Sequence, residues 1–142
     1  MANKENNVGL NISIINRAAL SYFTKALEPL HIGPGMQAYL LVIEDEEIIS
    51  QETIAKRLQV DKANVTRAMK SLEQLSMIHR IHDIKDQRRV LISLTEEGIR
   101  VKKEVTTISQ EWIEILKTPL NENEWSSFNN TLLKIINGLN NS

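Results

Sequence analysis

Two short helical segments separated by a tight turn constrain the fold of this chain more than any other feature. The first is predicted over 51–58, where Ser50 offers a side-chain oxygen to the free N–H groups of the first turn. The second is predicted over 62–75, after a second candidate N-cap, Asp61. Val65 and Leu72 recur at helical spacing on its inward side, whereas the opposite side is polar and positively charged. The pattern predicts two helices packed across a turn at Gln59, where glycine is common.

A β-hairpin is predicted directly after these helices. Residues 78–83 and 90–94 are rich in β-formers, and Val90, Ile92 and Leu94 alternate with more polar neighbours, as in a half-buried strand. The tip between them, 84–89, is polar and basic, and Ile48-Ile49 could add one rung to the small sheet. Helix, turn, helix and basic hairpin in this order describe a winged helix-turn-helix.

Longer amphipathic helices are predicted on both sides of this segment. They cover 10–30, about 35–44 with Pro34 as first helical residue, a span from the cap Thr95 to about 117, and a last helix after Asn121 and Glu124, which resemble a capping box. The 10–30 helix has a second apolar side, which indicates a partner subunit. The fold class is therefore mainly α with a small β-hairpin. We expect one compact domain, with residues 1–33 and 99–142 as a helical dimerisation layer and 34–98 as the DNA-binding lobe.

Charge and composition exclude several classes of function. The 142 residues carry a formal net charge of -1 and no cysteine, so thiolate catalysis, disulfides and zinc–thiolate sites are excluded. Counted by segment, 50–103 carries 12 basic and 7 acidic side chains, whereas both flanking segments are acidic. No glycine-rich phosphate loop and no cluster of acid, base and nucleophile appears, so an enzyme is not predicted and no cofactor is expected. The polar N-terminus and the lack of a long apolar run predict a cytoplasmic protein without a membrane segment.

The candidate DNA contacts lie on the outward face of the 62–75 helix, at the start of the 51–58 helix and at the hairpin tip. A helix of this kind enters the major groove, where long donors reach phosphates and base edges. Lys62, Lys70 and Lys85 fit a phosphate contact and an ordinary solvated lysine equally well. The full set is Ser50, Gln51, Lys62, Asn64, Thr66, Arg67, Lys70, Lys85, Arg88 and Arg89.

Two linked motifs resemble those of the MarR (multiple antibiotic resistance regulator) family. One is the wing, Asp86-Gln-Arg88-Arg89 followed by a strand and Leu94-Thr95-Glu-Glu-Gly98, similar to the family's D-x-R-R and L-T-x-x-G. The other is the 60–67 segment with the Leu-Glu pair at 72–73, so the resemblance spans 50–98. Residues 32–37 are also similar to the family's entry to its second helix, with Gly33 in place of the usual Ser or Thr cap.

The resemblance implies a homodimeric transcription regulator that binds a pseudo-palindromic double-stranded operator. Each subunit would place the 62–75 helix in a major groove and its wing in the neighbouring minor groove. Thr66 and Arg67 correspond to recognition-helix contacts and Arg88 to the wing-tip arginine, while Asp86 is expected to pair with an arginine and fix the hairpin. Ser50 and Gln51, at a helix N-terminus, are candidates for a phosphate oxygen.

Candidate effector and metal residues are weaker. Family members of this kind are often released from DNA by small aromatic acids, and a guanidinium such as Arg17 would suit a carboxylate; an ordinary exposed arginine is the alternative. Arg17 would line an effector cavity between the dimerisation layer and the DNA-binding lobe, and His31, Met36 and Tyr39 are further candidates for the same cavity. His79 and His82 are three residues apart on one strand and point to opposite faces, so no metal site is expected.

The leading hypothesis is therefore a homodimeric winged-helix regulator, a repressor released by a ligand. The alternative is a winged-helix module that binds a protein partner without sequence-specific DNA binding.

Overall fold

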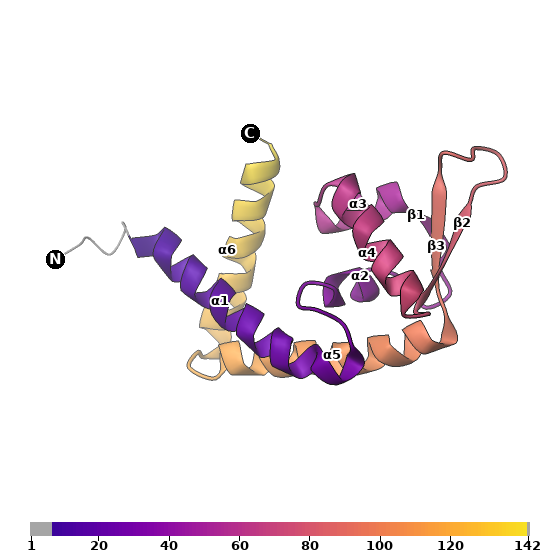
Figure 1. The fold of residues 1–142 in the computed structure, drawn as a ribbon. Coiled ribbons are helices and arrows are strands. Elements are labelled where there is room, and N and C mark those ends of the chain that lie inside the picture. The colour runs from indigo at the N-terminus through magenta and orange to yellow at the C-terminus, as the bar shows by residue number, and fades with distance from the viewer. Residues whose placement is uncertain (1–6, 142) are drawn as a thin grey trace. The chain divides into compact units, whose positions relative to one another are not determined.

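The computed structural model describes residues 7–141 and confirms a mainly helical fold with a small antiparallel sheet (Figure 1). Contacts divide the chain into two units, one ending at Ile108 and the other beginning at Ser109. None of the helices in the described part has the length and apolar character of a membrane span. In chain order, the elements are α1 (Val8–Leu27), the 3-10 helix η2 (Glu28–Leu30), α2 (Gln37–Leu41), β1 (Ile49–Ser50), α3 (Gln51–Leu58), α4 (Lys62–Gln74), β2 (Ile78–His82), β3 (Val90–Leu94), α5 (Glu96–Lys117) and α6 (Glu122–Asn140).

Helices α3 and α4 form the predicted helix-turn-helix. Ser50 caps α3 as expected, its hydroxyl accepting a hydrogen bond from the Thr53 N–H at 3.1 Å. The turn residue Gln59 has left-handed backbone angles, φ 55° and ψ 47°. The Val60 N–H then donates to the Ala55 carbonyl at 3.1 Å, which closes the end of α3. Glutamine takes this conformation at a modest cost, so the helix-turn-helix forms without the usual glycine.

The sheet has the order β1-β3-β2, and one of its faces completes the core. Ile92 of β3 pairs with Ile49 of β1 on one side and with Arg80 of β2 on the other. The predicted extra rung at Ile49 is therefore confirmed. Core side chains that are fully buried come from both helices of the helix-turn-helix, the sheet and their neighbours: Leu27, Leu40, Ile43, Ile54, Val65, Met69, Leu72, Ile92, Val101 and Val105.

Thr95 and Gly98 join the end of the wing to α5. The Thr95 hydroxyl donates to the Ser76 carbonyl at 2.7 Å and accepts from the Gly98 N–H at 2.9 Å, so Thr95 caps α5 as predicted. The Thr95 N–H also donates to the Met77 carbonyl at 3.0 Å. Gly98 packs so closely that a Cβ added there would lie 2.0 Å from the Met77 carbonyl oxygen. This motif thus has a structural role: it clamps α5 against the turn before β2.

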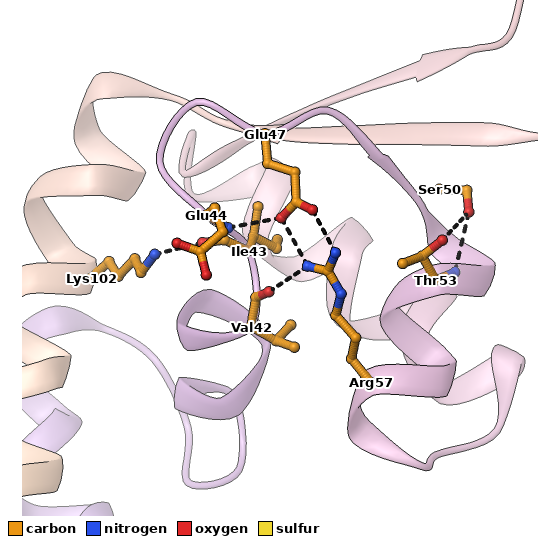
Figure 2. Close-up of polar contacts among 8 residues, drawn as sticks. All are labelled: Val42, Ile43, Glu44, Glu47, Ser50, Thr53, Arg57 and Lys102. Atoms are coloured by element: carbon orange, nitrogen blue, oxygen red, sulfur yellow. Dashed lines mark hydrogen bonds and ion pairs between the residues drawn. The ribbon is translucent and has the colours of Figure 1, made fainter.

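An ion pair between Arg57 and Glu47 holds α3 to the loop after α2. Both guanidinium Nη atoms donate to the Glu47 carboxylate, at 2.6 and 2.8 Å, and Nη1 also donates to the Val42 carbonyl at 3.1 Å (Figure 2). The Glu44 N–H donates to the same carboxylate at 3.0 Å. The Arg57 hydrogen bonds, followed by the Glu44 N–H, lower the pKa of Glu47 from 4.5 to about 2. The carboxylate therefore stays ionised well into the acid range.

Lys102 ties α5 to the same loop. Its Nζ donates to the Ile43 carbonyl at 2.6 Å (Figure 2). The same Nζ lies 3.2 Å from the Asp45 carboxylate. The Lys102 side chain is only 15% exposed, so these contacts are partly shielded from water. The loop between α2 and β1 is thus held from both sides, by α3 through Arg57 and by α5 through Lys102.

The second unit contains the end of α5 and the whole of α6. The capping box predicted for α6 is confirmed: the Asn121 side chain accepts from the Glu124 N–H, and the Glu124 carboxylate accepts from the Asn121 N–H. The Lys117 ammonium lies 5.8 Å from the centre of the Trp125 ring. No residue of α6 is buried. Its exposed apolar side chains include Phe128, Leu132, Leu133, Ile135 and Ile136.

One prediction about a helix start was wrong, and a second was right in its position only. Pro34 does not begin α2, because Gly35 has φ +94°, outside the helical region, and its N–H donates to the Gln37 side chain. Helix α2 consequently starts at Gln37 and has only 5 residues. Asp61 stands at the N-cap of α4 with extended backbone angles, but its side chain makes no capping hydrogen bond. The position was predicted correctly, whereas the stabilising interaction was not.

Replacing Gly98 with alanine should destabilise the protein by about 3 kcal/mol, the upper end of the usual range for overpacking. The new Cβ would collide with a backbone carbonyl, which cannot rotate away as a side chain can. Urea unfolding followed by circular dichroism measures this change. Gly9→Ala is the matched control, because a Cβ there meets no atom within 4 Å. Equal stability of the Gly98→Ala variant and the wild type would contradict the clamp.

Replacing Glu47 with glutamine should flatten the acid dependence of stability. The folded-state pKa is lowered, so the ionised carboxylate stabilises the fold fully above pH 4.5 and loses this effect as the pH falls toward about 2. The wild type should therefore lose stability over this window more steeply than Glu47→Gln. The free energy of unfolding, measured in urea across the window, gives the comparison. Glu46→Gln, at an exposed neighbouring position, should keep the wild-type slope.

Candidate nucleic-acid interface

Basic and polar side chains from three elements line one small hollow. Ser50, Gln51 and Glu52 come from the start of α3, Lys62 from the start of α4, and Arg88 and Arg89 from the wing. They meet because β1 leads directly into α3 while pairing with β3, with Ser50 opposite Leu91. Five residues from the predicted contact set are thus brought together at a helix N-terminus, where N–H groups favour an anion.

The outward face of α4 is exposed as predicted. Lys62, Asn64, Arg67 and Lys70 are exposed, whereas Val65 and Ala68 point into the core. Lys62 forms an ion pair with Glu52 at 3.2 Å, with both side chains about 60% exposed. The Arg67 guanidinium donates to the Asn64 side-chain oxygen. Exposed pairs of this kind are weak, so these cations remain available to a phosphate or a base edge.

The wing tip presents Lys85, Arg88 and Arg89 to solvent. Within residues 7–141, Arg88 forms no ion pair, whereas Arg89 lies 3.6 Å from the Asp83 carboxylate. Ile84 at the same tip is 98% exposed. The wing therefore offers a guanidinium that forms no ion pair with the part of the chain that the structure describes.

Asp86 fixes the hairpin, but not by pairing with an arginine side chain as expected. Its carboxylate accepts a hydrogen bond from the Arg88 N–H at 3.1 Å, and its carbonyl accepts one from the Arg89 N–H at 2.9 Å. The first bond is that of an Asx turn, and the second closes a β-turn over the same residues. The Asp86 carboxylate therefore fixes the backbone at Arg88, whereas the ion pair with the Arg89 side chain is formed by Asp83.

Ser50 and Gln51 are buried, with 3% and 4% exposure, which the sequence did not indicate. The Ser50 hydroxyl is used in capping α3, and the Gln51 amide donates to the Thr66 hydroxyl at 3.1 Å. The sequence singled out Gln51 and Thr66 as separate DNA contacts. In the structure these two side chains are hydrogen-bonded to each other across the helix-turn-helix. Contact of Ser50 or Gln51 with a phosphate stays a prediction.

The candidate effector residues fall into two groups. Met36 and Tyr39 line an open cavity of about 350 Å3 whose other wall is α4, with Asn64 and Arg67. Arg17 and His31 do not line it; both are exposed, and His31 has left-handed backbone angles after η2. The structure therefore associates Met36 and Tyr39 with Arg67 rather than with Arg17.

The histidines do not form a cluster. Over residues 7–141 no group of three or more His, Cys, Asp or Glu side chains could hold a metal ion. One ring has a structural contact: Nδ1 of His82 lies 2.8 Å from the Gln87 carbonyl and links the strand to the wing tip.

Comparison with known proteins supports the winged-helix reading. A family model described as MarR family matches residues 38–90. The HTH-type transcriptional regulator BilQ of Clostridioides difficile is 28% identical over 104 residues, which cover 73% of this chain and 70% of that protein.

Solved structures align over nearly the whole chain. A MarR transcriptional regulator from Methanosarcina mazei is 30% identical with a TM-score of 0.84, covering 96% of this chain and 99% of that one. MepR from S. aureus, solved as a DNA complex, is 25% identical with a TM-score of 0.83, covering 92% and 97%.

Proposed function

The chain belongs to the MarR family of transcriptional regulators, and from this membership we propose that it binds an operator in double-stranded DNA as a homodimer. The observation that carries the proposal is the hollow where the start of α3, the start of α4 and the wing bring Lys62, Arg88 and Arg89 together. A similar structure, MepR, has been solved bound to DNA. The function places this protein in the cytoplasm, with the DNA, and requires no catalytic activity or cofactor.

We assign the contacts by groove. Helix α4 enters the major groove, where Arg67 and Asn64 reach base edges and Lys62 and Lys70 reach phosphates. The wing lies over the adjacent minor groove, whose negative potential attracts the weakly hydrated guanidinium of Arg88. Lys85 and Arg89 contact the backbone beside it. The exposure of these side chains, and the lack of an ion pair to Arg88 among residues 7–141, support this arrangement.

Exposed apolar helix faces support a homodimer. Helix α1 exposes Leu10, Ile12, Ile14 and Ile15, each at 48% or more, and α6 exposes its own apolar face. Contiguous apolar surface of this kind is unusual on a monomer and marks an interface. We therefore propose that residues 1–33 and 99–142 form the dimerisation layer and 34–98 the DNA-binding lobe. Two-fold symmetry then matches two half-sites about one helical turn apart.

We further propose that the protein represses transcription and is released by a small aromatic acid. The cavity beside α4 supports this, because it combines the apolar walls of Met36 and Tyr39 with the Arg67 guanidinium. A carboxylate paired with Arg67 there would compete directly with DNA. A flat thermal-shift response to a panel of aromatic acids would remove this part of the proposal and leave DNA binding intact.

Replacing Arg88 with alanine should weaken DNA binding by about 1–3 kcal/mol. It should also reduce the slope of the logarithm of the binding constant against the logarithm of salt concentration by roughly one for each wing. Fluorescence anisotropy with the protein's own upstream DNA, repeated over a salt series, measures both quantities. Arg88→Lys should restore the salt slope but only part of the affinity, since lysine lacks the planar fork. Lys103→Ala, which removes an exposed charge on α5, is the control. If the chain is instead a winged-helix module that binds a protein partner, neither the wild type nor any of these variants should show salt-dependent DNA binding.

Replacing Leu133 with glutamate should convert the dimer to a monomer. Leu133 is 59% exposed on α6, so the change is not expected to disturb the core of a single chain, whereas it places a charge in the proposed interface. Sedimentation equilibrium should show the mass falling from two chains to one. Asn130→Glu should leave the dimer intact, because this exposed position of the same helix lies opposite Phe128 and Leu132 by helical periodicity. A wild type that sediments as a monomer would contradict the dimer.

A further inference from the structure

The hydroxyl of Thr66 already uses its only proton and one of its two lone pairs within the protein. Its oxygen donates its only proton to the Lys62 carbonyl one turn earlier, at 3.1 Å. The same oxygen accepts a hydrogen bond from the Gln51 side-chain amide, also at 3.1 Å. A threonine hydroxyl has one proton to give, so Thr66 in this arrangement cannot donate to a base acceptor.

The Gln51 side chain makes this contact from a buried position. The residue is 4% exposed, and its Oε1 atom has no hydrogen-bond partner within the described chain. A buried carbonyl oxygen without a partner costs about 1–3 kcal/mol, so the side chain is not placed there for its own stability. The hydrogen bond from Gln51 Nε2 to the Thr66 hydroxyl links the first turn of α3 to α4. The bond restricts rotation of the Thr66 side chain about Cα–Cβ.

The other branch of the Thr66 side chain, beside the hydroxyl, is a methyl group. Thr66 is half-buried and lies between the exposed residues Asn64 and Arg67 on the face assigned to the major groove. With the hydroxyl hydrogen-bonded to Lys62 and Gln51, the branch that makes no hydrogen bond to the protein is apolar. The only apolar group that the base pairs display in the major groove is the thymine C5 methyl.

We propose that Thr66 is a specificity-determining residue that recognises the C5 methyl of one thymine in each half-site, with Gln51 as the positioning residue that fixes its orientation. The inference rests on the proposed DNA binding and deepens it. It assigns a thymine, rather than a hydrogen-bonded guanine or adenine, to the base pair facing this position.

The test replaces thymine by deoxyuridine, which differs only by the missing methyl group. A binding site is first selected from a random duplex pool with the wild-type protein, and each thymine is then replaced in turn. At one thymine in each half-site, the wild type should lose about fourfold in affinity, as expected for one buried methyl-sized group. At the other thymines affinity should be unchanged.

Two variants separate the methyl from the hydroxyl. Thr66→Ser keeps the hydroxyl and its partners but removes the methyl, so it should bind thymine and deoxyuridine sites equally. Thr66→Val keeps a methyl and should retain the fourfold preference. Gln51→Leu fills the buried space without the hydrogen bond and should reduce the preference, because Thr66 can then rotate. Circular dichroism establishes that each variant is folded, and if Thr66→Val is not, the wild type and Thr66→Ser decide the question.

Three results overturn the inference. The first is a wild type that binds the selected site yet discriminates at no thymine, which leaves the proposed DNA binding intact. The second is Thr66→Ser retaining the full preference, which assigns the thymine methyl to another residue. A Gln51→Leu variant with unchanged preference removes the positioning role. Failure to bind any duplex, by contrast, rejects the proposed function itself.

Discussion

The left-handed turn at Gln59 determines how α3 and α4 cross, and every element of the proposed DNA-binding surface depends on that crossing. A residue with φ 55° reverses the chain within a few residues, so that α4 begins beside the end of α3. Val65 and Ile54 can then pack with no exposure to solvent. The same crossing brings Thr66 within hydrogen-bond distance of Gln51, fifteen positions earlier in the chain. A small backbone cost at one residue thereby fixes both a core contact and a surface geometry.

The structure shows which positive charges are committed to the fold and which are not. Arg57, Arg80 and Arg100 all form ion pairs with glutamates, and for Arg100 the partners Glu97 and Glu104 raise its pKa further above its ordinary value. Lys102 is held by a carbonyl and an aspartate. The excess of basic residues in the middle of the chain therefore serves two purposes. Part of it ties helices to loops, and the exposed remainder on α4 and the wing forms the candidate interface.

Local signals allowed much of the fold to be predicted from the sequence. Ser50, Thr95 and Asn121 each cap a helix through a hydrogen bond that depends only on the next few residues, and the alternation in 90–94 marks a strand at its observed bounds. The start of α2 was predicted too early because the positive φ of Gly35, not the ring of Pro34, determines where the helix can begin.

The candidate site shows the same division between local and distant effects. Exposure of Arg67 and Arg88 follows from helical periodicity and turn chemistry, which are readable along the chain. The burial of Gln51 and its bond to Thr66 depend on how two helices approach each other. A polar residue in the first turn of a short helix gives no local sign of pointing inward. Similarly, Asp83 and Asp86 both precede Arg89, and only the hairpin geometry decides which of them reaches its side chain.

The contact of Gly98 with the Met77 carbonyl has a mechanical consequence. With no Cβ between the start of α5 and the turn before β2, there is no compressible side chain to absorb a displacement. The three hydrogen bonds around Thr95 brace the same joint. The first turns of α5 and the base of the wing therefore behave as one stiff lever. A reorientation of α5 would therefore move the base of the wing with it, and in the proposed homodimer such a movement would change the spacing between the two wings.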